Sequence, residues 1–266
     1  MYKEFYHLNE YPFNITCDPT FFFSSSRHLD AFAHLIYGIQ QRKGILVVTG
    51  EIGTGKTTLC RTLLDRLDQK TKTALILNPN FSELQLLQLI IRDLGIDTKH
   101  KNKFALIDAL NEFLIQETSL GHNIVLIIDE AQNLKPNQLE QIRLLSNLET
   151  EKEKLLQIIL VGQPELMDKL KLSSLRQLNQ RVAVRYHVLP LEAREVERYI
   201  HHRLKIGGAN GNLLFTPAAL EKIYHHSQGT PRLVNIICDR ALLAGFVAET
   251  FTIDEHIVKQ CIEEVT

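Results

Sequence analysis

The chain carries the stretch Gly50-Glu51-Ile52-Gly53-Thr54-Gly55-Lys56-Thr57, which fits the phosphate-binding pattern G-x-x-x-x-G-K-[ST]. The apolar run Ile45-Leu46-Val47-Val48 precedes it and predicts a buried strand, and the residues from Thr58 onward predict a helix. Glycine lets such a loop wrap closely around a phosphate with its N–H groups pointing inward, and the N-terminus of the next helix adds a positive dipole end. The order of strand, loop and helix therefore predicts a nucleotide-binding loop.

Each residue type in this loop suits one part of a nucleotide bound with Mg²⁺. Lys56 is expected to reach the β- and γ-phosphates, and the Thr57 hydroxyl is expected to bind Mg²⁺. The expected cofactors are ATP and Mg²⁺. The residues expected to contact the nucleotide here are Gly50, Glu51, Ile52, Gly53, Thr54, Gly55, Lys56, Thr57 and Thr58.

A pair of carboxylates follows a second apolar run. Residues 124–128 read Ile-Val-Leu-Ile-Ile, as expected for a central parallel strand covered on both faces, and Asp129 and Glu130 come next. Ligands of open α/β sheets bind at the carboxyl ends of the strands. We expect Asp129 to bind Mg²⁺ and Glu130 to act as the base that activates the attacking water. Together with the loop, this pair predicts an enzyme that hydrolyses ATP.

Composition limits the other classes of function. The 266 residues include 30 basic and 31 acidic side chains, a net charge of -1, which gives no global positive field for nucleic acid. The four cysteines are scattered without a C-x-x-C pair, as in a reducing compartment. No apolar run approaches the roughly 20 residues that span a bilayer, and the N-terminus lacks a signal-peptide pattern. We therefore expect a cytoplasmic protein without a membrane span.

Strands and helices alternate through the middle of the chain. Helices of this length between strands imply right-handed crossovers and a parallel, three-layer α/β sheet. A capping box at Ser82–Gln85 and Pro136 at the first turn of its helix mark two helix starts. Beyond the two strands already described, the predicted strands cover residues 72–78, 155–161 and 184–189, and the predicted helices cover residues 83–95, 104–120 and 136–148.

The pattern changes after Pro190, where helices alone are predicted. They cover residues 192–206, a segment starting at Thr216-Pro217, residues 231–248, and a segment opened by the capping box Thr252–Glu255. We therefore predict two domains, a nucleotide-binding α/β domain over residues 1–189, with an N-terminal segment, and a helical domain over residues 190–266. This second domain resembles the lid of an AAA+ ATPase, and the fold class implied is the AAA+ branch of P-loop NTPases.

The resemblance assigns further site residues. Gln163, after the strand ending at Gly162, is similar to the first sensor of AAA+ proteins, and Arg232 lies in a G-x-P-R stretch similar to the second sensor. An arginine finger that reaches the site of a neighbouring subunit is implied at Arg181, with Arg176 as the alternative. A plain surface charge is the other interpretation of either arginine. The resemblance thus implies a homo-oligomer that shares its ATP sites.

Several blocks of the sequence carry a more specific resemblance. They are residues 5–8 with Pro12-Phe13, Asp18-Pro19 and Phe21-Phe22-Phe23, then Asp129–Gln132, residues 146–151, residues 162–166 and residues 231–238. These blocks resemble the ExeA/GspA/MshM group of bacterial secretion and pilus-assembly ATPases. The AAA+ resemblance implies that the entry segment, around Pro12 and Phe13, borders the adenine pocket; attachment of the N-terminus to the core is the alternative. Longer members of the group carry a transmembrane helix and a peptidoglycan-binding domain, which this sequence does not contain.

That group implies an ATPase that supports assembly of a type II secretion system or a type IV pilus. Its partner would be an inner-membrane assembly protein, and any membrane association would be peripheral, through that partner. An alternative is a DNA-associated AAA+ regulator of the transposition type, for which the basic stretches Arg42-Lys43 and Lys99–Lys103 are the local support. A further alternative is a nucleotide-gated adaptor with little turnover. The net charge disfavours the first alternative, and Glu130 disfavours the second.

Overall fold

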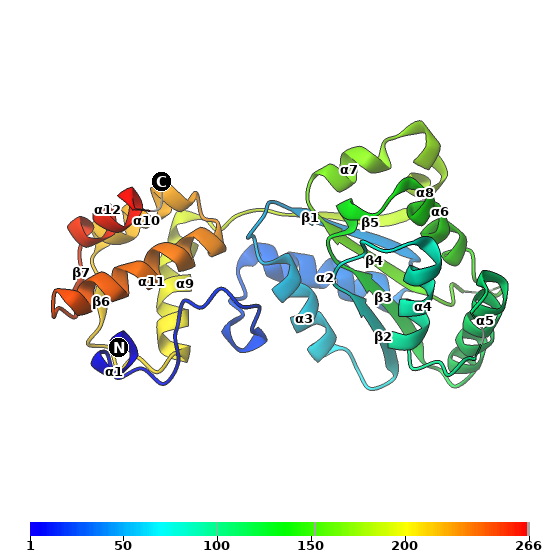
Figure 1. The fold of residues 1–266 in the computed structure, drawn as a ribbon, viewed down its shortest axis with the longest axis horizontal. Helices are drawn as coiled ribbons and strands as arrows, with labels where there is room; N and C mark the ends of the chain where they lie inside the picture. Colours follow the sequence, from blue (N-terminus) through cyan, green and yellow to red (C-terminus); the bar gives the residue numbers. More distant parts are fainter. Residues whose placement is uncertain (100, 152, 265–266) are drawn as a thin grey trace. The chain divides into compact units, whose positions relative to one another are not determined.

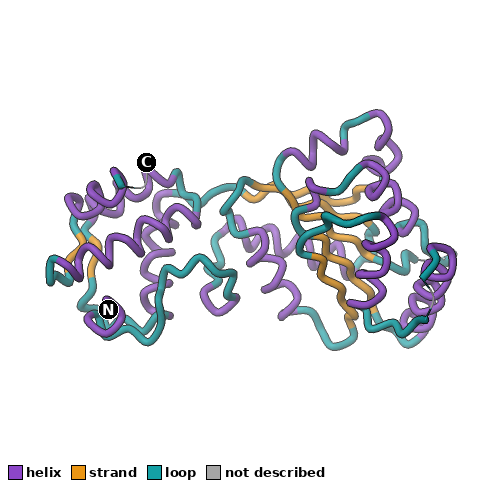
Figure 2. The backbone as a smooth tube through the Cα atoms, in the orientation of Figure 1, coloured by secondary structure: helices purple, strands orange, loops and turns teal. Residues whose placement is uncertain are grey.

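The structure, a computed structural model, describes residues 1–99, 101–151 and 153–264. His100 of the basic stretch Lys99–Lys103 therefore lies outside the described residues. Contacts divide the chain into two compact units. The α/β unit comprises Leu29–Ile52 and Cys60–Val188, and the helical unit comprises Met1–His28, Gly53–Leu59 and Leu189–Thr266. Figure 2 shows the strands of the main sheet within the α/β unit and a predominance of helix in the other unit.

A five-stranded sheet in the order β2-β3-β4-β1-β5 forms the centre of the α/β unit (Figure 1). Every neighbouring pair of its strands is parallel. The predicted parallel α/β fold is thus confirmed. The strands are β1 (Ile45–Gly50), β2 (Thr71–Ile76), β3 (Asn123–Ile128), β4 (Gln157–Gly162) and β5 (Val182–Val188).

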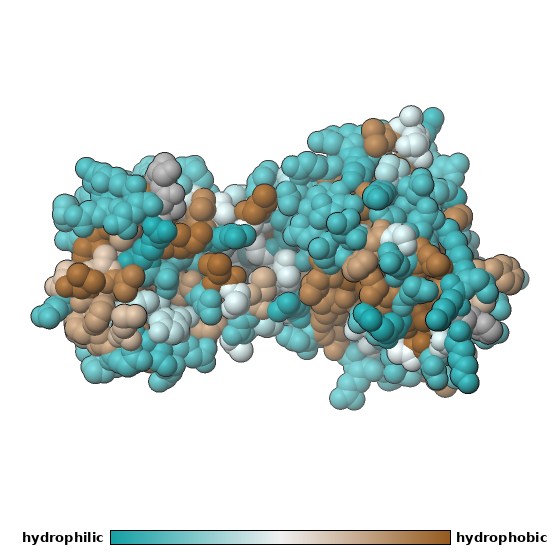
Figure 3. All heavy atoms as spheres, viewed as in Figure 1, coloured by the Kyte–Doolittle hydropathy of each residue, from teal (hydrophilic) through white to brown (hydrophobic). Residues whose placement is uncertain are grey.

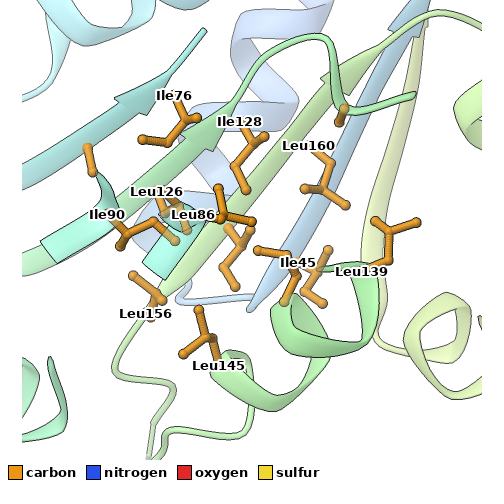
Figure 4. Close-up of a cluster of buried hydrophobic side chains, with 14 of the residues drawn as sticks. Ile45, Ile76, Leu86, Ile90, Leu126, Ile128, Leu139, Leu145, Leu156 and Leu160 are labelled. Carbon is orange, nitrogen blue, oxygen red and sulfur yellow. The ribbon is translucent and has the colours of Figure 1, made fainter. Parts of the chain in front are cut away.

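Helices cover both faces of this sheet. On one face, α4 (Glu83–Asp93), α5 (Lys103–Ser119) and α6 (Pro136–Leu145) contribute to one apolar cluster with alternate residues of the strands. Figure 4 shows its side chains, among them Leu86 and Ile90 of α4 with Leu126 of β3, all fully buried. On the other face, α2 (Ser26–Gln40) approaches β1 so closely that a side chain at Gly38 would overlap Leu46. The unit therefore has three layers.

The predicted helix starts follow from their caps. The Ser82 hydroxyl accepts a hydrogen bond from the Gln85 N–H at 3.3 Å, and the Gln85 amide oxygen accepts one from the Ser82 N–H at 2.9 Å. This reciprocal pair is the predicted capping box of α4. Pro136 occupies the first turn of α6, also as predicted, but α6 ends at Leu145 rather than near Leu148.

The helical unit contains the predicted helices α9 (Ala193–Ile206), α10 (Pro217–Ser227), α11 (Pro231–Val247) and α12 (Glu255–Glu263). The expectation of helices alone was wrong, because β6 (Leu214–Phe215) and β7 (Thr252–Ile253) pair in parallel. The capping box at Thr252–Glu255 was also wrong, since Asp254 caps α12 by accepting from the Ile257 N–H at 3.0 Å. Ile253 is buried and Thr252 exposed, and this alternation belongs to a strand.

The N-terminal segment packs within the helical unit. It begins with α1 (Tyr2–Phe5), and the Tyr2 hydroxyl donates to the Asp239 carboxylate. The Tyr6 hydroxyl donates to the Thr250 carbonyl at 3.1 Å, and the Asn9 N–H donates to the Gly207 carbonyl at 2.8 Å. The grouping by contacts thus joins the two ends of the chain. The division into domains at residues 189 and 190 stays a prediction.

The remaining helices are α3 (Lys56–Arg66), α7 (Glu165–Leu170) and α8 (Arg176–Gln180). On the visible face of each unit, polar residues predominate and apolar residues interrupt them (Figure 3). The most exposed large apolar side chains of the described residues are Phe104, at 82%, Met1, at 81%, and Val247, at 76%. Across the described part of the chain, every helix is too short or too polar to span a lipid bilayer.

Candidate nucleotide-binding site

Three strands of the α/β unit end beside one another with the predicted site residues. β4 lies between β1 and β3, and the register pairs Thr49 with Gly162 and Ile128 with Leu160. Gly50 closes β1, while Asp129 and Gln163 directly follow β3 and β4. Because the strands are parallel, these residues lie at the same edge of the sheet. This is the edge where ligands bind in open α/β folds.

The phosphate loop connects the end of β1 to the start of α3 at Lys56. Gly53 and Gly55 have φ values of +82° and +93°, where L-residues are strained, so the spacing of these glycines follows from backbone geometry. Thr54 and Lys56 are buried at 1% and 6% exposure. By contacts, Gly50–Ile52 groups with the α/β unit and Gly53–Leu59 with the helical unit. The loop therefore has the strand, the helix and the backbone that the sequence motif requires.

Within the helical unit, the loop contacts the first turn of α11. The Arg232 N–H donates to the Gly53 carbonyl at 3.2 Å. A Cβ atom at Gly53 would lie 2.7 Å from the Arg232 Cβ and 3.2 Å from the Thr230 Cγ2. The structure thus brings together the loop and the predicted second-sensor arginine, and glycine at position 53 leaves space for that approach.

Asp129 is a buried carboxylate at the end of β3, with 2% exposure. Its N–H donates to the Ile76 carbonyl at 2.8 Å, which fixes the backbone at the sheet edge. Its Oδ1 accepts from the Glu130 N–H at 2.9 Å. A buried carboxylate at this edge fits the donor chemistry of Mg²⁺, which prefers oxygen and is usually held by one or two protein groups plus phosphates.

Glu130 has a left-handed backbone, with φ of 52°. A residue other than glycine pays about 1–2 kcal/mol for this conformation, so its neighbours must hold it there. The Gln132 amide nitrogen donates to Glu130 Oε2 at 2.6 Å, and the Gln163 amide nitrogen lies 3.5 Å from the same oxygen. The side chain proposed as the base is thus oriented by two amides from the ends of β3 and β4.

Gln132 links the two strand ends. Its amide oxygen accepts from the Gln163 N–H at 3.0 Å, while its amide nitrogen donates to Glu130. A side chain at Gly162 would lie 2.8 Å from that amide oxygen, so glycine gives Gln132 its space. Lys169 of α7 donates to the carbonyls of Gln132 and, at 2.8 Å, Leu134. The sequence pattern assigns no role to Gln132, although an amide two residues after Glu130 is a signal that points to one.

The predicted arginine finger lies elsewhere on the α/β unit. Arg176 begins α8 and Arg181 caps its end, and both are exposed. This exposure is compatible with contact to another subunit and equally with a solvated charge. The role of either arginine stays a prediction.

Pro12 and Phe13 belong to the core of the helical unit. The Arg203 guanidinium donates to the Pro12 carbonyl and, at 3.0 Å, to the Asn14 carbonyl. Phe13 is 1% exposed, and its ring meets Phe215 edge-on at 6.3 Å between centroids. These contacts attach the N-terminal segment to α9 and β6, as the packing interpretation expects. The adenine contact stays a prediction.

The oxygen donors fit the expected metal. Thr57 follows Lys56 in the first turn of α3, and its hydroxyl and the Asp129 carboxylate are both hard oxygen ligands. Within residues 1–99, 101–151 and 153–264, no group of three or more His, Cys, Asp or Glu side chains is arranged to hold a metal ion by itself. The fit therefore depends on phosphate oxygens as the remaining ligands.

Comparison with known proteins places the chain in a family. The AAA domain family matches residues 39–170, which include the loop, the carboxylate pair and Gln163. General secretion pathway protein A of Aeromonas hydrophila is 45% identical over 247 residues. That alignment covers 92% of this chain and 45% of the relative, so the chain spans a little under half of the relative's length.

Solved structures with a similar fold share much less sequence. Cdc6p from Pyrobaculum aerophilum has a TM-score of 0.68 at 18% identity, covering 99% of this chain and 71% of that one. The ORC2 protein of Aeropyrum pernix, solved with ADPNP and ADP, has a TM-score of 0.65 at 17% identity and coverages of 88% and 66%. The RuvB branch migration motor of Thermotoga maritima has a TM-score of 0.60 at 18% identity and coverages of 91% and 69%. With the family match and the secretion relative, the parallel sheet and its phosphate loop identify the chain as a member of the AAA+ ATPases of the ExeA/GspA/MshM group.

Proposed function

We propose that this protein binds ATP with Mg²⁺ and hydrolyses it to ADP and phosphate. The phosphate loop, with Lys56 and Thr57 at the start of α3, would hold the phosphates and the metal, and Asp129 would be the second metal ligand. Bound Mg²⁺ would neutralise charge on the phosphate oxygens. Glu130 would orient and deprotonate the attacking water, while Gln163 and Arg232 would contact the γ-phosphate.

The orientation of Glu130 is the observation that supports hydrolysis over simple binding. Its carboxylate accepts from the Gln132 amide at 2.6 Å while its own backbone is strained. A pre-oriented carboxylate is what water activation requires, because the base must lie within hydrogen-bond reach of the proton that it takes.

Two substitutions separate binding from hydrolysis. Glu130→Gln should bind ATP with an affinity near that of the wild type and hydrolyse it at least about a hundredfold more slowly, the typical contribution of a general base. Lys56→Ala should lose ATP binding itself. Titration with a fluorescent ATP analogue and steady-state phosphate release measure the two effects. Undiminished turnover in Glu130→Gln would contradict the proposal.

We further propose that ATP turnover supports assembly of a cell-envelope secretion system or type IV pilus. The support is the relative named general secretion pathway protein A. The protein would act as a homo-oligomer in the cytoplasm and meet the inner membrane through an assembly protein. Deletion of the gene in its own bacterium, complemented by wild type or Glu130→Gln, tests this role. Loss of secretion or piliation that wild type alone restores is the expected result.

A DNA-associated regulator is tested by the same phosphate-release assay. Duplex DNA should leave the activity unchanged if the proposal holds. Stimulation by DNA that weakens steeply with salt would instead favour the DNA-bound alternative, because phosphate contacts release counterions.

A further inference from the structure

A buried histidine contacts the backbone of the phosphate loop. His28 lies in the first helical turn of α2 and is 5% exposed. Its Nε2 lies 3.3 Å from the carbonyl oxygen of Thr54, and its Nδ1 lies 2.7 Å from the Ser25 hydroxyl. All of these residues belong to the helical unit. The ring therefore connects the N-terminal segment to the loop.

The partners of the ring fix its protonation. A carbonyl oxygen can only accept, so Nε2 must carry the hydrogen and donate it to Thr54. In the neutral ring, Nδ1 then accepts from the Ser25 hydroxyl, whose oxygen also accepts from the His28 N–H at 3.2 Å. Burial lowers the pKa of His28, which favours this neutral form. The ring is thus held in one tautomer and one orientation.

The contact falls at the turn that precedes the lysine of the loop. A Cβ atom at Gly55 would lie 3.3 Å from His28 Nε2, so the ring packs directly against the backbone of Thr54 and Gly55. A loop that directs its N–H groups toward an anion must satisfy its carbonyls elsewhere. His28 supplies a donor to one of these carbonyls two residues before Lys56.

We propose that His28 is a positioning residue that holds the phosphate loop in the conformation that accepts the phosphates of ATP. The inference rests on the proposed nucleotide binding and adds a contact outside the sequence motif. Without the donor, the Thr54 carbonyl loses one of the contacts that fix its direction, and a carbonyl turned toward the phosphates would repel them. Binding should then weaken, whereas the chemical step, performed at Asp129 and Glu130, should keep its rate.

The test compares two replacements of His28 in the full chain. His28→Leu removes the donor, and we expect the Kd and KM for ATP to rise about five- to tenfold, the usual worth of one hydrogen bond. The kcat should stay within about twofold, because the lost interaction acts equally in the ground and transition states. His28→Gln, whose amide can donate to Thr54, should restore most of the affinity. His34→Leu, at an exposed position of the same helix, is the matched control and should match wild type.

Melting temperatures show which variants are folded. Unchanged Kd and KM in folded His28→Leu, or a fall in kcat alone, would overturn the inference while leaving the proposed ATPase intact. If His28→Leu does not fold, Ser25→Ala carries the test, with an expected rise of about two- to threefold in KM; an unchanged KM there would overturn the inference. Wild-type protein that fails to bind ATP would overturn the proposed function and this inference together.

Discussion

At the scale of single residues, the side-chain amide of Gln132 makes two hydrogen bonds in the candidate site. It holds the Glu130 carboxylate and accepts from the Gln163 backbone. We predict that Gln132→Leu lowers the kcat for ATP hydrolysis about thirtyfold with little change in KM, because two hydrogen bonds of about 1 kcal/mol each orient the base rather than the nucleotide. Steady-state kinetics test this. Gln116→Leu, on the exposed side of α5, should behave as wild type; equal kcat in both variants would contradict the role.

Gly53 allows a second residue-scale prediction with an internal control. Gly211 has a similar φ of +90°, but a methyl group there would have no atom within 4 Å, whereas one at Gly53 would meet Arg232. Gly211→Ala should therefore show the backbone cost alone, about 1–2 kcal/mol of stability. Gly53→Ala should add steric overlap and displace the loop from α11, so ATP binding should weaken more than tenfold, an effect of about 1.4 kcal/mol or more. Thermal melts and ATP titration check both. Equal ATP affinity in the two variants would argue against close packing of the loop.

At the scale of elements, Glu195 caps two helices. Its Oε1 accepts from the N–H and the hydroxyl of Ser26 at the start of α2, at 3.0 and 2.9 Å, and its Oε2 accepts from the Glu192 N–H at the start of α9. Burial raises the pKa of this carboxyl, but the hydrogen bonds from Glu192 and Ser26 outweigh burial and lower it below the ordinary value of 4.5. The charged form therefore stabilises the fold.

The lowered pKa gives a pH prediction. A carboxyl whose folded-state pKa is depressed contributes its full stability above the unfolded-state value, here about 4.5, and loses it as pH falls through the folded-state pKa. At neutral pH, the melting temperature of wild type should lie several degrees above that of Glu195→Gln, because the lost interactions are worth about 1 kcal/mol. This difference in melting temperature should become smaller below pH 4.5. Melting curves at pH 7 and pH 4 test this, and a gap that widens with acid would contradict it.

Among the secondary-structure elements, the strands buried on both faces of the sheet were the ones that the sequence predicted most directly. β1, β3 and β4 are almost completely buried and read as continuous apolar runs. α7 and α8, with 6 and 5 residues, are too short for periodicity to reveal them. α2 was not predicted, although its buried Ala31, Leu35 and Ile39 have helical spacing. β6 and β7 have two residues each, and only their pairing makes them strands.

The residues of the candidate site also fall into two groups, those that local sequence predicts and those that it does not. The loop and the carboxylate pair are contiguous in sequence, so local pattern alone predicts them. Gln132 acts through Gln163, which lies 31 residues further along the chain, and His28 acts through Thr54, 26 residues away. Such roles arise from tertiary contacts, and a single sequence does not reveal them.

At the scale of the whole molecule, an ATP site that is shared between two subunits would make ATPase activity depend on oligomer formation. If Arg181 completes the site of a neighbouring subunit, specific ATPase activity should rise with protein concentration. Arg181→Ala should then lose about a thousandfold, the lower range for arginine fingers. Mixing Arg181→Ala with Lys56→Ala should restore activity, because a mixed pair contains one site with both an intact loop and an intact finger. Arg176→Ala, measured in the same way, tests the alternative finger. No recovery on mixing would contradict a finger acting between subunits.

Because residues 1–28 pack with residues 189–266 in one unit, the N-terminal segment cannot fold until the later residues have been made. Residues 1–28 are made before residues 29–188, yet their partners on α9 and α11, such as Asp239 for Tyr2, are made some two hundred residues later. Residues 29–188 can pair their strands in the meantime. The tyrosines and phenylalanines of the N-terminal segment therefore stay without their native neighbours until residues 189–266 have been made. In the growing chain, this segment is the part that most needs protection from a wrong partner.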